Sequence, residues 1–182
     1  HVAYTLTAES EANPYFGVQV NNIGTNNVFE AARLLGVKRI VFASSIAAYS
    51  PSEVYGDRVV KEDEPTMKPQ SIYGASKVFN ELMAEKLQKR YGIEIISNRI
   101  SAVYGVGREK RGVTAWFSQM LDAAFTSQPV DLPIRPNQFA SFISANDVAE
   151  QLIRLLRKPD LTHTLYNSGG IPATPFNFFS LL

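Results

Sequence analysis

The chain has no cysteine and only two histidines, His1 and His163, among its 182 residues. The absence of cysteine excludes disulfides, thiolate nucleophiles and cysteine-ligated zinc, and two histidines alone cannot build a histidine metal site. No apolar run approaches the roughly 20 residues that a bilayer-spanning helix needs, and the first residues do not read as a signal peptide. We therefore expect a cytoplasmic protein with no metal and no membrane partner.

The chain also has almost no excess of positive over negative charge. The formal net charge is +1, and the Lys and Arg residues are scattered without forming a basic stripe. This distribution argues against a nucleic-acid partner and favours a small-molecule ligand. A glycine-rich turn of the G-x-G-x-x-G kind is missing as well, since Gly105-Val106-Gly107 leads into charged residues rather than into an apolar helix.

The patterns that are present alternate between strand and helix. Buried-strand patterns fall at 39–43, 93–100, 140–143 and 164–167, and helical patterns at 17–35, 73–90 and 113–125. Ser144 to Asp147 has capping-box spacing and opens a helix with Val148, Leu152, Leu155 and Leu156 turned inward, while Thr174-Pro175 opens a last helix. Residues 50–70 read as a loop. Such alternation predicts an α/β fold, a parallel sheet with helices on both faces. Residues 1–4 look like the end of a strand and the last helix is short, so we expect a fold that is incomplete at both ends.

Tyr73 and Lys77 are the residues with the clearest chemical potential. Residues four apart on a helix share one face, so the Lys77 ammonium can lie near the Tyr73 phenol and lower its pKa from about 10 toward that of a general base. Ser44 and Ser45, at the end of a buried strand, could supply a hydroxyl beside them. Taken alone, Y-x-x-x-K favours a surface tyrosine and lysine on an amphipathic helix over a catalytic pair.

Several ordered motifs give the chain a wider resemblance. They are His1-Val2-Ala3, Asn21-Asn22-Ile23-Gly24-Thr25, Val41-Phe42-Ala43-Ser44-Ser45, Ser71-Ile72-Tyr73-Gly74-Ala75-Ser76-Lys77 and the stretch from Arg99 to Gly105. Together they resemble the central and C-terminal parts of an extended short-chain dehydrogenase/reductase of the NAD-dependent epimerase/dehydratase family. The resemblance implies a Rossmann-like fold, with residues 1–105 in the dinucleotide-binding domain. It places 106–182 mainly in a small substrate-binding lobe, with segments that return to the Rossmann domain.

The resemblance also assigns roles. It implies that Tyr73 is the catalytic acid/base, that Lys77 holds the nicotinamide ribose, and that Ser45 rather than Ser44 is the catalytic serine. Asn21 matches a residue that supports the active-site helix, although a plain helix N-cap is an equal alternative. The cofactor is NAD or NADP, and the positions matched to it are Val2, Ala3, Tyr4, Ala43, Ser44, Tyr73, Lys77, Ile100, Ala102 and Val103.

The departures from the family pattern bear on the substrate. Ile46 and Ala47 stand where sugar-nucleotide dehydratases carry Asp-Glu, so elimination of water is not expected. Ala102 and Ala140 stand where nucleotide-sugar enzymes carry an asparagine and a diphosphate-binding arginine. These replacements indicate a small substrate such as a sugar acid, placed near Ser45 and Ala47, with Arg108 or Arg135 meeting a carboxylate. Ordinary solvated loop charges are an equal explanation for both arginines, and Trp116 and Phe117 fit core or lid packing better than a ligand platform.

Three hypotheses therefore remain open. The favoured one is an NAD(P)-dependent oxidoreductase or epimerase with a Ser-Tyr-Lys triad. The others are a non-catalytic regulatory member that binds the dinucleotide and an inactive fragment. By the same resemblance we expect a homodimer through the helices at 17–35 and 73–90.

Overall fold

Two three-stranded sheets form the framework of the protein. The computed structural model describes residues 1–56, 58–64, 67–105, 116–126, 129, 131–132 and 139–180. The first sheet is parallel, in the order β1 (Arg39–Ser45), β2 (Glu94–Ile100), β5 (Leu165–Asn167). In the second, β4 (Ala140–Ser144) lies between β3 (Ala102–Tyr104), its parallel neighbour, and β6 (Ile171–Ala173), which runs antiparallel.

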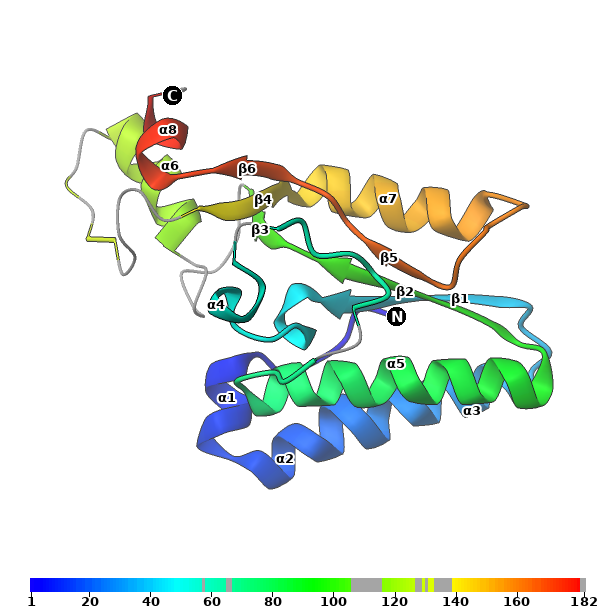
Figure 1. Ribbon diagram of the computed structural model, residues 1–182. Coiled ribbons are helices and arrows are strands. Elements are labelled where there is room, and N and C mark those ends of the chain that lie inside the picture. Colours follow the sequence, from blue (N-terminus) through cyan, green and yellow to red (C-terminus); the bar gives the residue numbers. More distant parts are fainter. Residues whose placement is uncertain are drawn as a thin grey trace.

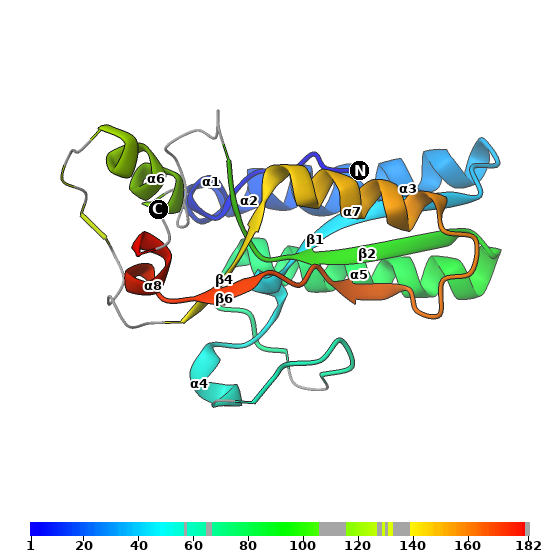
Figure 2. The ribbon, with the colours of Figure 1, turned by 90° about the horizontal axis from the view of Figure 1, so that it is seen from above.

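Helices cover both faces of the first sheet (Figure 1). On one face lie α3 (Thr25–Leu34) and α5 (Ile72–Tyr91), and on the other lies α7 (Ala145–Arg157). The view from above shows α6 (Trp116–Thr126) and α8 (Pro175–Phe179) at one end, beyond the second sheet (Figure 2). The remaining helical segments are α1 (Thr7–Ala12), α2 (Pro14–Val18), the π-helix η1 (Gln19–Gly24), the 3-10 helix η2 (Ile46–Ala48) and α4 (Ser52–Tyr55).

The first residues lie along β1. The His1 amino group donates to the Val41 carbonyl (2.7 Å), and the Ala43 amide donates to the His1 carbonyl (3.0 Å). The His1 ring also stacks on Phe42. The segment thus runs beside β1, as the predicted end of a strand should, without enough pairing to count as one.

The core between the first sheet and helices α3 and α5 is apolar and includes Phe29, Phe42, Ala84, Ile93 and Ile95. Burial of these side chains fixes α5 against the sheet, because a helix of this kind owes most of its stability to tertiary packing. Ser71 caps the start of α5 by accepting a hydrogen bond from the Gly74 amide, and Gly92, with φ of 70°, ends it in the left-handed conformation.

A second apolar cluster holds the smaller lobe together. It contains Trp116, Phe117, Met120, Phe142 and Ala173, and the rings of Phe117 and Phe142 are stacked 3.7 Å apart. Trp116 and Phe117 are therefore core residues, which is the packing role that the sequence favoured.

The structure corrects several sequence predictions. The helix expected from residue 17 begins at Pro14 and contains the π-helical turn η1, and α1, α4, β3 and β6 were not predicted. Leu156 on α7 was expected to face inward, but it is 51% exposed, whereas Val148, Leu152 and Leu155 are half-buried. Among the described residues, no helix has the length and apolar character needed to cross a membrane.

Candidate active site

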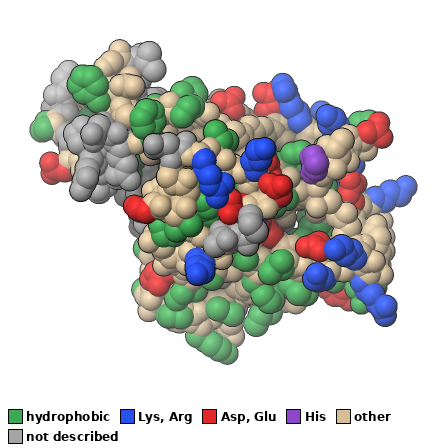
Figure 3. Space-filling view, viewed as in Figure 1, with side chains coloured by type: hydrophobic (Ala, Val, Ile, Leu, Met, Phe, Trp, Pro, Cys, Tyr) green, Lys and Arg blue, Asp and Glu red, His purple; other side chains and the backbone are tan. Residues whose placement is uncertain are grey.

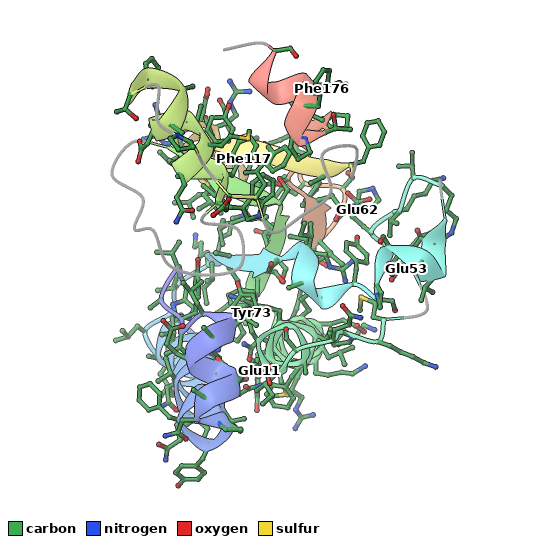
Figure 4. The ribbon with its side chains drawn as sticks, turned by 90° about the vertical axis from the view of Figure 1, so that its left-hand side faces the viewer. Glu11, Glu53, Glu62, Tyr73, Phe117 and Phe176 are labelled. Atoms are coloured by element: carbon green, nitrogen blue, oxygen red, sulfur yellow. The ribbon has the colours of Figure 1, made fainter. Side chains whose placement is uncertain are left out.

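The candidate site lies where the carboxyl end of β1 meets the first turns of α5. Ser44 and Ser45 end β1, while Tyr73 and Lys77 lie on consecutive turns of α5. Figure 4 shows Tyr73 at the start of α5, next to α1 and below the end of β1. Ligands of open parallel sheets bind outside the carboxyl ends of the strands, so the position itself is that of a binding site.

Ser45 and Tyr73 are in contact. The Ser45 hydroxyl lies near enough to the Tyr73 phenol to favour its phenolate, and Ser45 Oγ accepts a hydrogen bond from the Ala47 amide (3.1 Å). Ser44 is directed elsewhere, since its hydroxyl donates to the Glu81 carboxylate. Of the two serines, Ser45 is therefore the one placed to share a substrate oxygen with Tyr73.

Lys77 is enclosed by aromatic rings. Lys77 is only 2% exposed, and its Nζ donates a hydrogen bond to the Ala43 carbonyl (2.7 Å). Nζ also lies 4.3 Å from the ring centroid of Tyr4, 4.8 Å from that of Phe42 and 5.2 Å from that of Tyr73. The ammonium thus faces the ring of Tyr73 and is held by cation–π contacts.

The ionisation of this pair differs from the prediction. Burial, together with the nearby Tyr4, raises the pKa of Tyr73, and the bond to Ser45 opposes this only in part. Burial lowers the pKa of Lys77 to about 7, against the opposing attraction of Glu81. The expectation that Lys77 lowers the pKa of Tyr73 is wrong for the chain by itself, because desolvation of both groups outweighs their interaction.

Asn21 holds the segments around the site together. Its side chain accepts from the Thr5 amide (2.8 Å) and donates to the Thr5 carbonyl (3.1 Å), and its own carbonyl accepts from Asn80 on α5 (2.7 Å). Asn21 lies inside η1, so the alternative of a plain N-cap is wrong. Within this π-helical turn, the Asn21 backbone carbonyl accepts the hydrogen bond from Asn80 and so supports α5.

The other predicted positions are distributed along the same edge. Val2, Ala3 and Tyr4 are exposed, Ala43 accepts the Lys77 hydrogen bond, and Ile100 pairs with Ser45 in register. Ala47 lies in η2 beside Ser45. Ala102 and Val103 belong to β3, where Ala102 packs against the second cluster. Arg108 and Arg135 lie outside the described residues.

Sequence reasoning missed a buried charge pair next to the site. Arg99 on β2 donates to Glu81 on α5 from Nη2 (2.7 Å) and Nε (3.0 Å). The i, i+4 spacing of Lys77 and Glu81 on a helix was a usable signal for a charge on the same face.

The residues present fit the nicotinamide end of a dinucleotide. An ammonium has three donors, and among the described residues the Ala43 carbonyl is the one oxygen that Lys77 bonds. Two donors are thus left for ribose hydroxyls, at a strand edge beside the phenol of Tyr73. The chain holds no glycine-rich turn for the diphosphate, so it supplies only this end of such a site.

This geometry defines a dinucleotide-binding α/β protein with a serine, a tyrosine and a lysine at the sheet edge. The model of the NAD dependent epimerase/dehydratase family matches residues 1–169. The chain therefore belongs to this family of extended short-chain dehydrogenases/reductases, as the motifs predicted.

Individual relatives include both dehydrogenases and epimerases. The uronate dehydrogenase of Pseudomonas syringae pv. tomato is 30% identical over 148 residues, 80% of this chain and 42% of that protein. The L-threonine dehydrogenase structure from Phytophthora infestans is 26% identical with a TM-score of 0.87, covering 97% of this chain and 57% of the other. The UDP-glucose 4-epimerase of Thermus thermophilus in complex with NAD is 25% identical with a TM-score of 0.78, covering 99% and 58%.

These similarities establish the cofactor class but only part of the protein. NAD is the dinucleotide of the family, in agreement with the predicted cofactor. The chain spans about half the length of the curated relatives it matches.

Proposed function

We propose that the whole protein is an NAD-dependent oxidoreductase or epimerase that acts at a hydroxyl carbon of a small sugar-like or sugar-acid substrate. The observation that carries the proposal is the placement of Ser45, at the end of β1, with Tyr73 and the enclosed amino group of Lys77 on α5. A proton must move between the substrate oxygen and a positioned side chain while hydride moves at the adjacent carbon. NAD supplies the hydride chemistry when it is bound.

Each side chain has a distinct part in this proposal. Ser45 donates a hydrogen bond to the substrate oxygen and orients it toward Tyr73. Tyr73, whose pKa is raised by burial, holds its proton at neutral pH and donates it to a carbonyl oxygen during reduction. Oxidation needs the opposite transfer, so raising the pH should favour it. Lys77 uses its remaining donors to hold ribose hydroxyls.

The small substrate is supported by two replaced side chains. Ala140, in β4, has no guanidinium with which to bind a diphosphate. Ala102, in β3, has no side-chain amide that could donate a hydrogen bond. A charge-assisted contact is worth on the order of 1.5–3 kcal/mol, so losing two should weaken diphosphate binding roughly 100-fold or more. The likeness to a uronate dehydrogenase supports a sugar acid, and the likeness to an L-threonine dehydrogenase supports only a small hydroxylated substrate.

The test measures NADH formation and the formation of epimers by the whole protein with a panel of uronic acids, aldonic acids and polyols. The Tyr73→Phe variant should lose at least about 100-fold in rate while keeping NAD affinity, because the hydroxyl is removed and the ring is kept. Tyr15→Phe, at a tyrosine that is 74% exposed on α2, is the matched control and should retain the full rate. A Tyr73→Phe rate above about a tenth of the wild-type rate would rule out Tyr73 as the acid/base.

Calorimetric titration with UDP-glucose in the presence of NAD tests the substrate class separately. We expect no tight binding, and micromolar affinity would overturn the small-substrate proposal. A regulatory, non-catalytic role is the alternative, and it would be favoured if NAD bound tightly but no member of the panel turned over.

A further inference from the structure

Three charged side chains share the interior beside the candidate site. Lys77 and Glu81 are one turn apart on α5, and Arg99, on β2, is 1% exposed. Both nitrogens that Arg99 directs at Glu81 are within hydrogen-bond distance of its carboxylate, at 2.7 and 3.0 Å. Arg99 is further held by the Glu62 carbonyl, the Met67 sulfur and the ring of Tyr49.

Glu81 is bonded to residues of both β1 and β2, and these two residues lie side by side in the sheet. Ser44, which donates to Glu81, pairs with Arg99 in the parallel register of β1 and β2. The next pair along these strands is Ser45 with Ile100. One carboxylate therefore ties α5 to both strands a single residue before Ser45.

The same carboxylate lies one helical turn from Lys77 on α5. The titratable groups that face Lys77 are Tyr4 from the N-terminal segment and Tyr73 and Glu81 from α5. From β1 it meets the Phe42 ring and the Ala43 carbonyl, neither of which titrates. Burial lowers the pKa of Lys77 to about 7, and Glu81 is the group that opposes this fall.

We propose that Glu81 is a positioning residue for the Tyr73–Lys77 pair: its carboxylate keeps Lys77 protonated and fixes the Ser44–Ser45 end of β1 against α5. The inference rests on the proposed function, in which a charged Lys77 holds the cofactor. Glu81 acts through Lys77 and Ser44 and is not itself in contact with the reacting atoms.

The experiment follows the titration of Lys77 by NMR in the whole protein without cofactor, labelled with [13C]lysine. The Lys77 signal is assigned by its loss in Lys77→Arg. In Glu81→Gln the midpoint should fall by roughly one pH unit or more, because a neighbouring opposite charge is removed. Glu81→Asp, which keeps the carboxylate, should restore most of the shift.

Glu85→Gln is the matched control. Glu85 lies one turn further along α5, has a side chain that is 42% exposed and pairs with Lys89, so its removal should leave the Lys77 midpoint unchanged. An unchanged midpoint in Glu81→Gln, or an equal fall in Glu85→Gln, would overturn the proposal.

Glu81→Gln leaves the buried Arg99 without its partner and can prevent folding. The double variant Glu81→Gln/Arg99→Met removes both charges and carries the same test. Arg99 is not among the groups that shift Lys77, so the midpoint should still fall. A wild-type midpoint in this variant also overturns the proposal. If the midpoint falls but no substrate turns over, the positioning role holds and the proposed function fails.

Discussion

Lys77 illustrates how burial changes the behaviour of a single residue. Its amino group is surrounded by the rings of Tyr4, Phe42 and Tyr73, with one carbonyl oxygen in hydrogen-bond distance. Aromatic faces attract a cation but do not replace the water that an ammonium loses on burial. The folded protein therefore holds the Lys77 proton less tightly than the unfolded chain does.

This difference predicts a pH-dependent stability. With a folded pKa of about 7 and an ordinary value of 10.5, the unfolded chain binds more protons between pH 7 and 10.5, so stability rises with pH in that window. From pH 7 to 9 the free energy of unfolding of the wild type should rise by roughly 2 kcal/mol relative to that of Lys77→Met. Urea denaturation of both proteins at the two pH values measures this difference. A difference that stays constant, or that shrinks toward pH 9, would contradict a depressed pKa for Lys77.

At this scale the sequence could predict which residues meet but not how they ionise. The sequence patterns predicted that the side chains of Ser45, Tyr73 and Lys77 lie close together, and the structure places them at one end of the sheet. The protonation of the pair depends instead on burial beside Phe42 and Tyr4, which come from two other segments of the chain. Contacts of that kind are decided by the packed structure and leave no local pattern.

At the scale of elements, the site depends on the close approach of α5 to η2. A Cβ atom on Gly74 would lie 2.2 Å from the Ala47 carbonyl oxygen and 2.8 Å from Pro69 Cβ. No side chain fits there, because the nearest obstacle is backbone. The glycine after Tyr73 thus allows the start of α5 to pack closely against η2, which follows Ser45.

Gly74→Ala should therefore separate these two elements. We expect a loss of roughly 1–3 kcal/mol in the free energy of unfolding, as for other overpacked sites, together with a loss of turnover. Gly24→Ala is the control, since the nearest atom to its added Cβ is the Gln19 carbonyl oxygen at 3.6 Å. Alanine in that helical position should be neutral or stabilising. Urea denaturation measures the free energy of unfolding of both variants. Equal values for Gly74→Ala and Gly24→Ala would show that η2 moves aside without loss of stability.

Long elements with a clear period could be predicted, and short ones could not. The strands β1 and β2 and the helix α5 each contain enough apolar residues to show their period. The strands β3 and β6 have three residues each, and β6 includes Pro172, so neither shows an alternation that can be read. The π-helical turn η1 escaped notice because its sequence continues the helical pattern on both sides.

At the scale of the whole molecule, the outer face of α2, η1, α3 and α5 is unusually apolar. Figure 3 shows hydrophobic side chains gathered in the lower part of this view, where these helices lie. A groove of about 610 Å³ runs between them. It is lined by Val18, Asn22, Ile23, Asn26, Asn27, Ile72, Ala75, Ser76, Phe79 and Met83.

The exposed apolar side chains of this groove, among them Val18, Ile23 and Phe79, favour a second copy of the chain as its occupant. Asn22 Oδ1 and Asn26 Oδ1 are buried and have no hydrogen-bond partner among the residues that the structure describes. In a two-fold interface the same patch meets itself, so the apolar side chains and the exposed Asn27 amide of one copy meet those of the other. The apolar side chains around the groove would supply the buried area of such an interface, and the asparagines would fix how the two copies align.

We therefore expect the whole protein to be a homodimer through α3 and α5. Ile23→Glu places a charge in the groove at a side chain that is 53% exposed, and it should produce monomers at micromolar concentration in sedimentation equilibrium. Val59→Glu, in the loop before α5 and 84% exposed, is the control and should leave the dimer intact. Because Ile23 lies on the outer face, away from Lys77, the monomer should keep the Lys77 titration of the wild type. A wild-type protein that sediments as a monomer, or a dimer that survives Ile23→Glu, would show that this face serves another purpose.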